Sequence, residues 1–155
     1  MKGKVKFAFA AVLLVFTVCA VAVPSASAAR VILQNTLDNR VNIAITYFDR
    51  ATGLWTTRGW WRVDGNSDRT INIDNVDTGR NVLYVGMSGN TMYLDRSTLD
   101  SDPINRWISD DSFRFDSTSN SKPSGKNVRT VPFYRSRYSR SDGAYIIRID
   151  TRPVG

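Results

Sequence analysis

Apolar and polar positions alternate over most of the chain that follows residue 30. The alternation is cleanest over residues 40–48, where Val41, Ile43, Ile45 and Tyr47 share one face. A period of two is the period of a β-strand, so this segment is expected to be a half-buried strand with one apolar and one polar face. The same pattern predicts further short strands at residues 31–36, 54–63, 70–73, 81–87, 91–95, 128–134 and 144–149, with residues 106–108 and 112–115 as candidates for two more.

Composition and turn residues favour strands over helices. The chain contains no Glu and few Lys, whereas Val, Ile, Thr, Tyr and Trp are frequent. About eight or nine short strands with no helix between them predict an all-β fold, either an antiparallel β-sandwich or a small barrel. Residues 117–127 are rich in Ser, Thr, Asn, Gly and Pro, and they are expected to form a mobile polar loop.

The first 28 residues have the organisation of a secretory signal peptide. A basic start is followed by an apolar run over residues 7–23 and by Ala26-Ser27-Ala28, which is a typical cleavage pattern. We therefore expect an exported protein, periplasmic or secreted, with a single all-β domain over residues 29–155 and no retained transmembrane span. The alternative is an uncleaved N-terminal anchor.

Removal of this segment changes what the composition allows. Three of the 21 basic residues lie in it, so residues 29–155 carry 18 basic and 14 acidic side chains, a net charge of +4. The single cysteine, Cys19, also lies in it, and the chain has no histidine. Thiolate nucleophiles, imidazole bases and Cys/His zinc ligands are therefore excluded from the predicted domain, and we expect no cofactor and no metal. The charge is compatible with an anionic cell-envelope polymer or glycan as a partner, whereas nucleic acid is not expected of an exported chain.

Three of the four tryptophans lie close together between Gly53 and Val63. Trp60 and Trp61 are adjacent, and adjacent residues of a strand face opposite ways, so one layer cannot bury both. One indole is expected in the core, and the other requires a second layer, a covering loop or a ligand. The rings either fill the core or form a stacking platform for sugars. The candidate ligand-binding residues of such a platform are Tyr47, Trp55, Arg58, Trp60, Trp61 and Arg62.

Residues 135–140 form the densest basic stretch. Arg135, Arg137 and Arg140 are interleaved with Tyr138, and guanidinium groups next to ring faces can bind phosphates or anionic glycans. These three arginines are the candidate anion-binding residues. The alternative interpretation is a solvated loop between two strands.

Paired carboxylates suggest a third kind of chemistry. Asp100 and Asp102 form one pair and the adjacent Asp110 and Asp111 form another, and glycan hydrolysis uses two such acids. Adjacent side chains usually point apart, however, and both pairs lie in predicted turns, where Asp is common. We therefore assign no catalytic residue, and an Asp-based glycan hydrolase stays a lesser alternative.

The segment from residue 33 to residue 66 resembles a known bacterial family. It contains Asn35-Thr36, the strand that reaches Tyr47, Trp55-Thr56-Thr57-Arg58-Gly59-Trp60-Trp61 and Gly65. These residues are similar to domain-of-unknown-function family 1036, whose pattern runs from Cys-Asn-x-Thr through W-x-T-x-GWW to a Gly and a second Cys. This chain departs at both cysteines, because Gln34 occupies the first position and the segment around Ser67 has none. The resemblance implies a small exported β-domain without that disulfide, and it implies no activity.

These observations support three functional hypotheses. The first is a non-catalytic binding module of the cell envelope or secreted fraction, which uses an outward indole and neighbouring arginines. The second is a structural or assembly protein that contacts a partner protein through an exposed aromatic patch, and the third is the glycan hydrolase. A concave aromatic groove favours the first, a flat apolar patch the second, and two carboxyls facing each other across a cleft the third.

Overall fold

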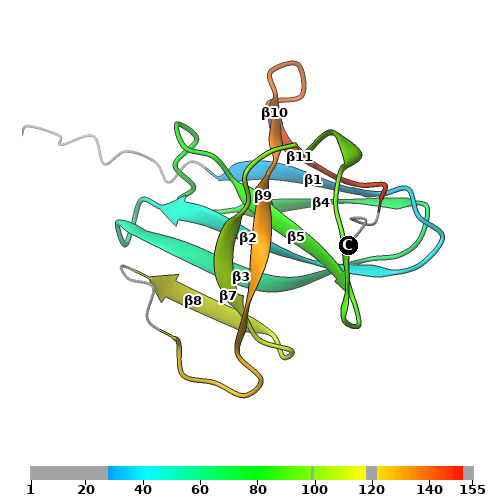
Figure 1. The fold of residues 1–155 in the computed structure, drawn as a ribbon. Helices are drawn as coiled ribbons and strands as arrows, with labels where there is room; N and C mark the ends of the chain where they lie inside the picture. Colours follow the sequence, from blue (N-terminus) through cyan, green and yellow to red (C-terminus); the bar gives the residue numbers. More distant parts are fainter. Residues whose placement is uncertain (1–27, 99, 118–121, 152–155) are drawn as a thin grey trace, which may run out of the picture.

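The computed structural model describes residues 28–98, 100–117 and 122–151, which fold into two β-sheets (Figure 1). No α-helix occurs in these ranges, and the predicted all-β fold is confirmed. A single 3-10 turn, η1 (Arg96–Thr98), interrupts the strands. The strands are β1 (Ala29–Asn35), β2 (Val41–Asp49), β3 (Leu54–Val63), β4 (Ser67–Ile73), β5 (Leu83–Ser88), β6 (Thr91–Tyr93), β7 (Ile104–Ile108), β8 (Phe113–Ser117), β9 (Arg129–Arg135), β10 (Arg137–Ser139) and β11 (Ala144–Ile149).

The sequence alternation predicts every one of these strands except β10. Eleven strands are therefore present in the described ranges, rather than eight or nine. β10 falls in the segment 135–140, for which a solvated loop was the alternative interpretation, and that interpretation is wrong for its three residues, which pair with β11. A strand of three residues is too short for a period of two to stand out in the sequence.

The smaller sheet has four strands in the order β10-β11-β1-β4. β1 lies inside this sheet, where it pairs with β4 in the antiparallel and with β11 in the parallel direction. Val31 and Leu33 of β1 are completely buried. The N-terminal strand is thus covered on both edges, and its apolar face lies against the other sheet.

The larger sheet has the order β7-β9-β5-β2-β3-β8, and β6 pairs with β5 beside this path. β9 pairs with β5 at two positions, Leu83 with Arg135 and Tyr84 with Tyr134, and then leaves it to pair with β7. Pro132 lies in the part of β9 that has left β5, where its missing N–H breaks no hydrogen bond of that pair. Figure 1 shows the β7–β9 ribbon crossing in front of β2 and β3. The larger sheet is therefore curled into a half-barrel with a concave side.

Both faces of β2 are buried, so the expectation of a half-buried strand is wrong. Ile43, Ile45 and Tyr47 pack in the main core between the two sheets. Ala44 and Thr46 lie on the opposite, concave side and are also 0% exposed. The period of two is correct; the curl of the larger sheet brings a second layer over the face that the pattern marks as polar.

Two apolar clusters hold the fold together, one on each face of the larger sheet. The main core joins the sheets, and its buried members come from both of them. The second, which we call the concave cluster, consists of Ala44, Leu83, Val85, Met87, Ile108 and Phe133. Each buried aliphatic side chain contributes roughly 1.5–3 kcal/mol of transfer free energy, so the concave cluster stabilises the curl itself.

Trp60 and Trp61 lie on opposite faces of β3, as the alternation predicts. Trp60 packs against the concave cluster and Trp61 against the main core. Both indoles are half-buried. Each indole packs in a layer of its own. Of the three alternatives considered for the second indole, the structure therefore shows a second layer of the fold.

The part of the chain that the structure describes contains no helix long and apolar enough to cross a membrane. Residues 1–27 of the predicted signal peptide lie outside the described residues, and so do residues 118–121 of the predicted mobile loop. Those two expectations stay predictions.

Candidate functional site

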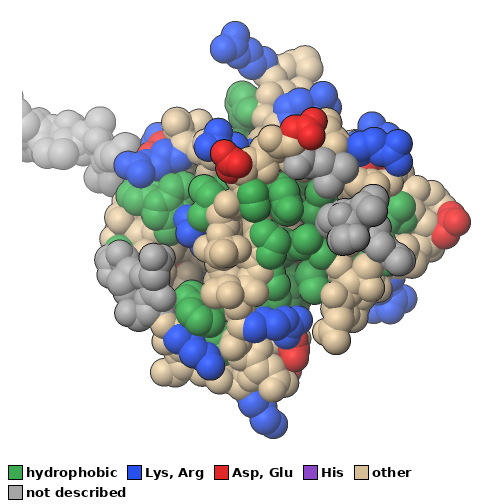
Figure 2. All heavy atoms as spheres, in the orientation of Figure 1, with side chains coloured by type: hydrophobic (Ala, Val, Ile, Leu, Met, Phe, Trp, Pro, Cys, Tyr) green, Lys and Arg blue, Asp and Glu red, His purple; other side chains and the backbone are tan. Residues whose placement is uncertain are grey.

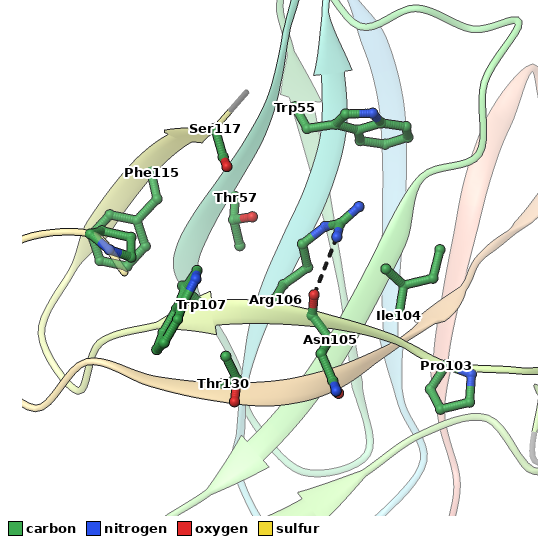
Figure 3. A pocket seen from close by; sticks show the side chains of 11 residues that line it. Trp55, Thr57, Pro103, Ile104, Asn105, Arg106, Trp107, Phe115, Ser117 and Thr130 are labelled. Carbon is green, nitrogen blue, oxygen red and sulfur yellow. Dashed lines mark hydrogen bonds between the residues drawn. The ribbon is translucent and has the colours of Figure 1, made fainter. Parts of the chain in front are cut away.

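The concave side of the larger sheet contains a cavity of about 620 Å³. It lies between β3 and β8 on one side and the β7–β9 ribbon on the other (Figure 3). Figure 2 shows that this face of the molecule is hollowed, with hydrophobic and basic side chains around the hollow. The size is typical of small-molecule sites. The cavity is lined by Trp55, Thr57, Pro103, Ile104, Asn105, Arg106, Trp107, Phe115, Ser117, Pro123 and Thr130.

Alternation along two neighbouring strands decides which side chains reach the cavity. Trp55 and Thr57 are two residues apart on β3, and Phe115 and Ser117 are two residues apart on β8. Thr56, between Trp55 and Thr57, and Asp116, between Phe115 and Ser117, face the other side of the sheet. There the Thr56 hydroxyl donates to the Asp116 carboxylate at 2.7 Å. Each strand thus contributes one aromatic and one small hydroxyl side chain to the cavity.

Charged groups on the outer side keep the edge strand β8 in this orientation. Arg114 donates to the Asp49 carboxylate at 2.9 Å and to the Asp116 carboxylate at 3.2 Å. The Asp49 side chain is only 5% exposed, and it also accepts the Ala51 N–H at 2.8 Å. Ion pairs with a buried partner are screened less by water than surface pairs, so this network ties β8 to the β2–β3 turn.

Stacked rings hold the Phe115 wall of the cavity in place. Phe115 stacks on Phe113 with ring centroids 4.9 Å apart, and Phe113 meets the edge of Trp60 at 5.5 Å. The Trp60 indole N–H donates at 3.0 Å to the carbonyl of Ser109, the residue that directly follows β7. These rings have partners of their own, so the wall needs no ligand to hold its shape.

The floor of the cavity includes Thr57 of β3, which is paired with Thr46 of the neighbouring strand β2, a residue outside the lining. The hydroxyls of Thr46 on β2 and Thr57 on β3 are 2.9 Å apart and share one hydrogen bond. Thr46 is 0% and Thr57 5% exposed. The small side chains leave room above them, and their polar atoms satisfy each other.

Arg106 is the one charged residue among those that line the cavity. Its guanidinium carbon lies 5.5 Å from the centre of the Trp55 ring, and Figure 3 shows the side chain extending from β7 toward that ring. Nη1 donates to the Asn105 carbonyl at 3.2 Å, whereas Nε is buried without a hydrogen-bond partner. Burial lowers the pKa of the Arg106 guanidinium, which still carries its charge at neutral pH. The cavity therefore combines ring faces with one cation.

The six residues proposed from the sequence as a stacking platform do not form one site. Trp55 lines the cavity. Tyr47 is 1% exposed in the main core, on the opposite face of the sheet. Arg62 is exposed and donates to the Asp64 carboxylate at 3.3 Å.

The other three members of that set line a second, smaller hollow of about 390 Å³. Arg58 lies over the Trp61 ring at 5.7 Å, and Trp60 borders the hollow from the neighbouring position. The sequence proposal is thus divided among the cavity, the core and this second hollow.

The three candidate anion-binding arginines lie where the chain passes from one sheet to the other. Arg135 ends β9 of the larger sheet, and Arg137 begins β10 of the smaller one. Between them the Ser136 N–H donates to the Val82 carbonyl at 2.9 Å. Arg135, Arg137 and Arg140 are exposed and outside the cavity lining, and anion binding by them stays a prediction.

The paired carboxylates lie outside the cavity as well. Asp100, Asp102, Asp110 and Asp111 are all exposed, and Asp110 forms an ion pair with Arg129. Over the described ranges there is also no group of three or more His, Cys, Asp or Glu side chains that could hold a metal ion.

Sequence reasoning missed Arg106, Trp107 and Phe115. A signal was present in the alternation: Ile104, Arg106 and Ile108 fall on the same face of a strand, and Ile108 is completely buried. A charged residue between two isoleucines on an apolar face indicates either a buried ion pair or a ligand site. The chemistry of the cavity follows: the rings can stack on a flat apolar surface, and the guanidinium can pair with an anion.

Comparison of the chain with protein-family models, with curated proteins and with solved structures finds no match. The resemblance of residues 33–66 to domain-of-unknown-function family 1036 therefore stays a prediction.

Proposed function

We propose that this protein is an exported, non-catalytic binding module and that the cavity is its ligand site. The observation that carries the proposal is a cavity of about 620 Å³ with aromatic walls on the concave side of a curled sheet. A concave aromatic site is the feature by which a binding module differs from a protein with a flat contact patch.

The arrangement of the walls supports the binding of a ring-shaped ligand. Trp55, Trp107 and Phe115 come from three different strands, β3, β7 and β8. Ring faces from several directions bury the apolar surface of a flat molecule or of a sugar ring and remove it from water. Because Phe115 is held by its own stacking partners, little side-chain freedom is lost when a ligand enters.

The hypothesis of a partner-protein patch receives less support. Of the large hydrophobic side chains that the structure describes, Ile104 and Tyr138 are the exposed ones, at 38% and 49%. They belong to different sheets, Ile104 to β7 and Tyr138 to β10. Two separated side chains fall short of the contiguous apolar area of a protein-binding site.

A thermal-shift screen of the purified protein tests the proposal, since a ligand of the native state raises the melting temperature. The panel contains cell-wall glycan fragments, anionic polymers, organic acids and neutral ring compounds. We expect a compound whose shift is lost in Trp55→Ala and retained in Tyr138→Ala, which removes an exposed ring from the other sheet. A panel without any hit, or hits that Trp55→Ala leaves unchanged, would contradict the proposal.

A further inference from the structure

The cavity contains a charge that forms no ion pair within the part of the chain that the structure describes. The ion pairs there use seven other arginines, and Arg106 is not among them. Its Nη1 donates to the carbonyl of its neighbour Asn105. A half-buried guanidinium without an anionic partner is unfavourable in the free protein, and it becomes favourable when an anion enters.

The position of that hydrogen bond decides which edge of the guanidinium is available. Nη1 donates to the Asn105 carbonyl, and Nε is buried without a hydrogen-bond partner among the described residues. Nε and Nη2 form the other edge of the guanidinium. This edge presents two parallel N–H groups, a geometry that matches the two oxygens of a carboxylate, sulfonate or phosphate. An oxyanion that accepts from Nη2 would lie beside the buried Nε–H.

The surroundings of Arg106 determine the rest of the ligand. The Trp55 ring lies 5.5 Å from the guanidinium carbon, and the Trp107 and Phe115 side chains line the same cavity. The lining residues that the structure describes include one cation and no carboxylate, so they balance a single negative charge.

We propose that the cavity binds organic monoanions, molecules with one oxyanion group on a flat or ring-shaped apolar body, and that Arg106 pairs with the oxyanion while Trp55 covers the ring. This inference rests on the proposed function and adds the ligand class to it. Such an anion can be a free aromatic acid or the acidic end group of a glycan, and both share the chemistry that Arg106 recognises.

Two fluorescent probes that differ by one charged group separate the inference from the proposed function. Anilinonaphthalene sulfonate carries a sulfonate on an aromatic body, and phenylnaphthylamine is the same body without it. We expect the sulfonate probe to bind the wild-type protein with one site, and Arg106→Met to weaken it by about tenfold or more. Arg106→Met should leave the affinity for the neutral probe unchanged or raised. Added salt should weaken the sulfonate probe alone.

Matched variants provide the controls. Arg30→Met removes one exposed positive charge from β1 of the smaller sheet and should change neither affinity. Arg106→Lys keeps the charge and loses the planar fork, so its affinity for the sulfonate probe should lie between those of wild type and Arg106→Met. A cooperative melting curve shows that each variant is folded. If Arg106→Met does not fold, Arg106→Lys is used in its place to test the role of the guanidinium.

Each outcome decides a different statement. Equal binding of both probes, unaffected by Arg106→Met, would overturn the anion inference and leave the proposed binding function standing. Failure of the folded protein to bind the sulfonate probe at low salt would also overturn it, and failure of both probes would count against the cavity as a ligand site. Competition with indole acetate and with glucuronate identifies the source: displacement by the first alone indicates a free aromatic acid, and displacement by glucuronate indicates a glycan end group.

Discussion

The hydrogen bond between Thr46 and Thr57 gives the sharpest test of how the cavity floor is built. Their hydroxyls are 2.9 Å apart, and each is the side-chain partner of the other. Thr57→Val leaves the Thr46 hydroxyl at 0% exposure without a partner, which should cost about 1–3 kcal/mol of unfolding free energy. Thr46→Val leaves the Thr57 hydroxyl beside the cavity, where water can replace the lost partner, so it should cost less than about 1 kcal/mol.

The double variant should be more stable than the sum of the two losses suggests. With both hydroxyls replaced by methyl groups of similar shape, no buried polar group is left unpaired, and the stability should lie within about 1 kcal/mol of wild type. Urea unfolding followed by circular dichroism measures all four proteins, and Thr70→Val at an exposed position of β4 is the control. Losses that add within about 0.5 kcal/mol, or a larger loss in Thr46→Val than in Thr57→Val, would refute the reasoning.

Three further outcomes are expected. Gly65→Ala should lower the free energy of unfolding by at least about 3 kcal/mol in urea denaturation, because the added Cβ would lie 2.0 Å from the Asp38 carbonyl oxygen. Gly89→Ala, where φ is +58° and the added Cβ meets no atom within 4 Å, should cost about 1 kcal/mol. Equal losses for the two variants would contradict this expectation. Burial raises the pKa of Tyr84 from 10.0 to about 12, so the stability that depends on its neutral hydroxyl is complete below pH 10 and is lost as the pH rises through about 12. Tyr84→Phe should move the alkaline unfolding midpoint upward, and an unchanged midpoint would show that another group controls it. Arg106→Met should raise the melting temperature, since an unpaired half-buried charge is removed; a fall would mean that the fold satisfies this charge.

The strands could be predicted from the sequence because their signal is local. Residues of β2 alternate along the strand, Tyr145, Ile147 and Ile149 share one face of β11, and turn residues mark the ends of both strands. The exposure of a strand's second face is not a local property. Ala44 is buried in one cluster with Ile108 of β7 and Phe133 of β9, two strands that lie far from β2 along the chain.

The candidate site could be predicted only in part, for the same reason. The density of aromatic residues in β3 predicts Trp55 as a site residue, and Trp55 does line the cavity. Arg106 and Phe115 lie on strands at opposite edges of the larger sheet, and its curl brings them together. Trp60, the more prominent residue in the sequence, instead supports the wall through Phe113. The residues that stand out as a motif build the scaffold, and those that face the cavity are distributed over several strands.

The parallel pairing of β1 with β11 has a consequence for the order in which the protein can fold. The Thr36 hydroxyl donates to the Ile149 carbonyl, 113 residues further along the chain. This contact lies directly after the last paired residues of the two strands, Asn35 and Ile149. During synthesis β1 is made first, and one of its two edges stays open until residues 144–149 are available. Contacts between such distant segments form slowly, so a nascent chain keeps the smaller sheet incomplete until residues 144–149 have been made. If the protein is exported as proposed, this delay keeps the chain unfolded while it crosses the membrane. β11 then completes the smaller sheet after export.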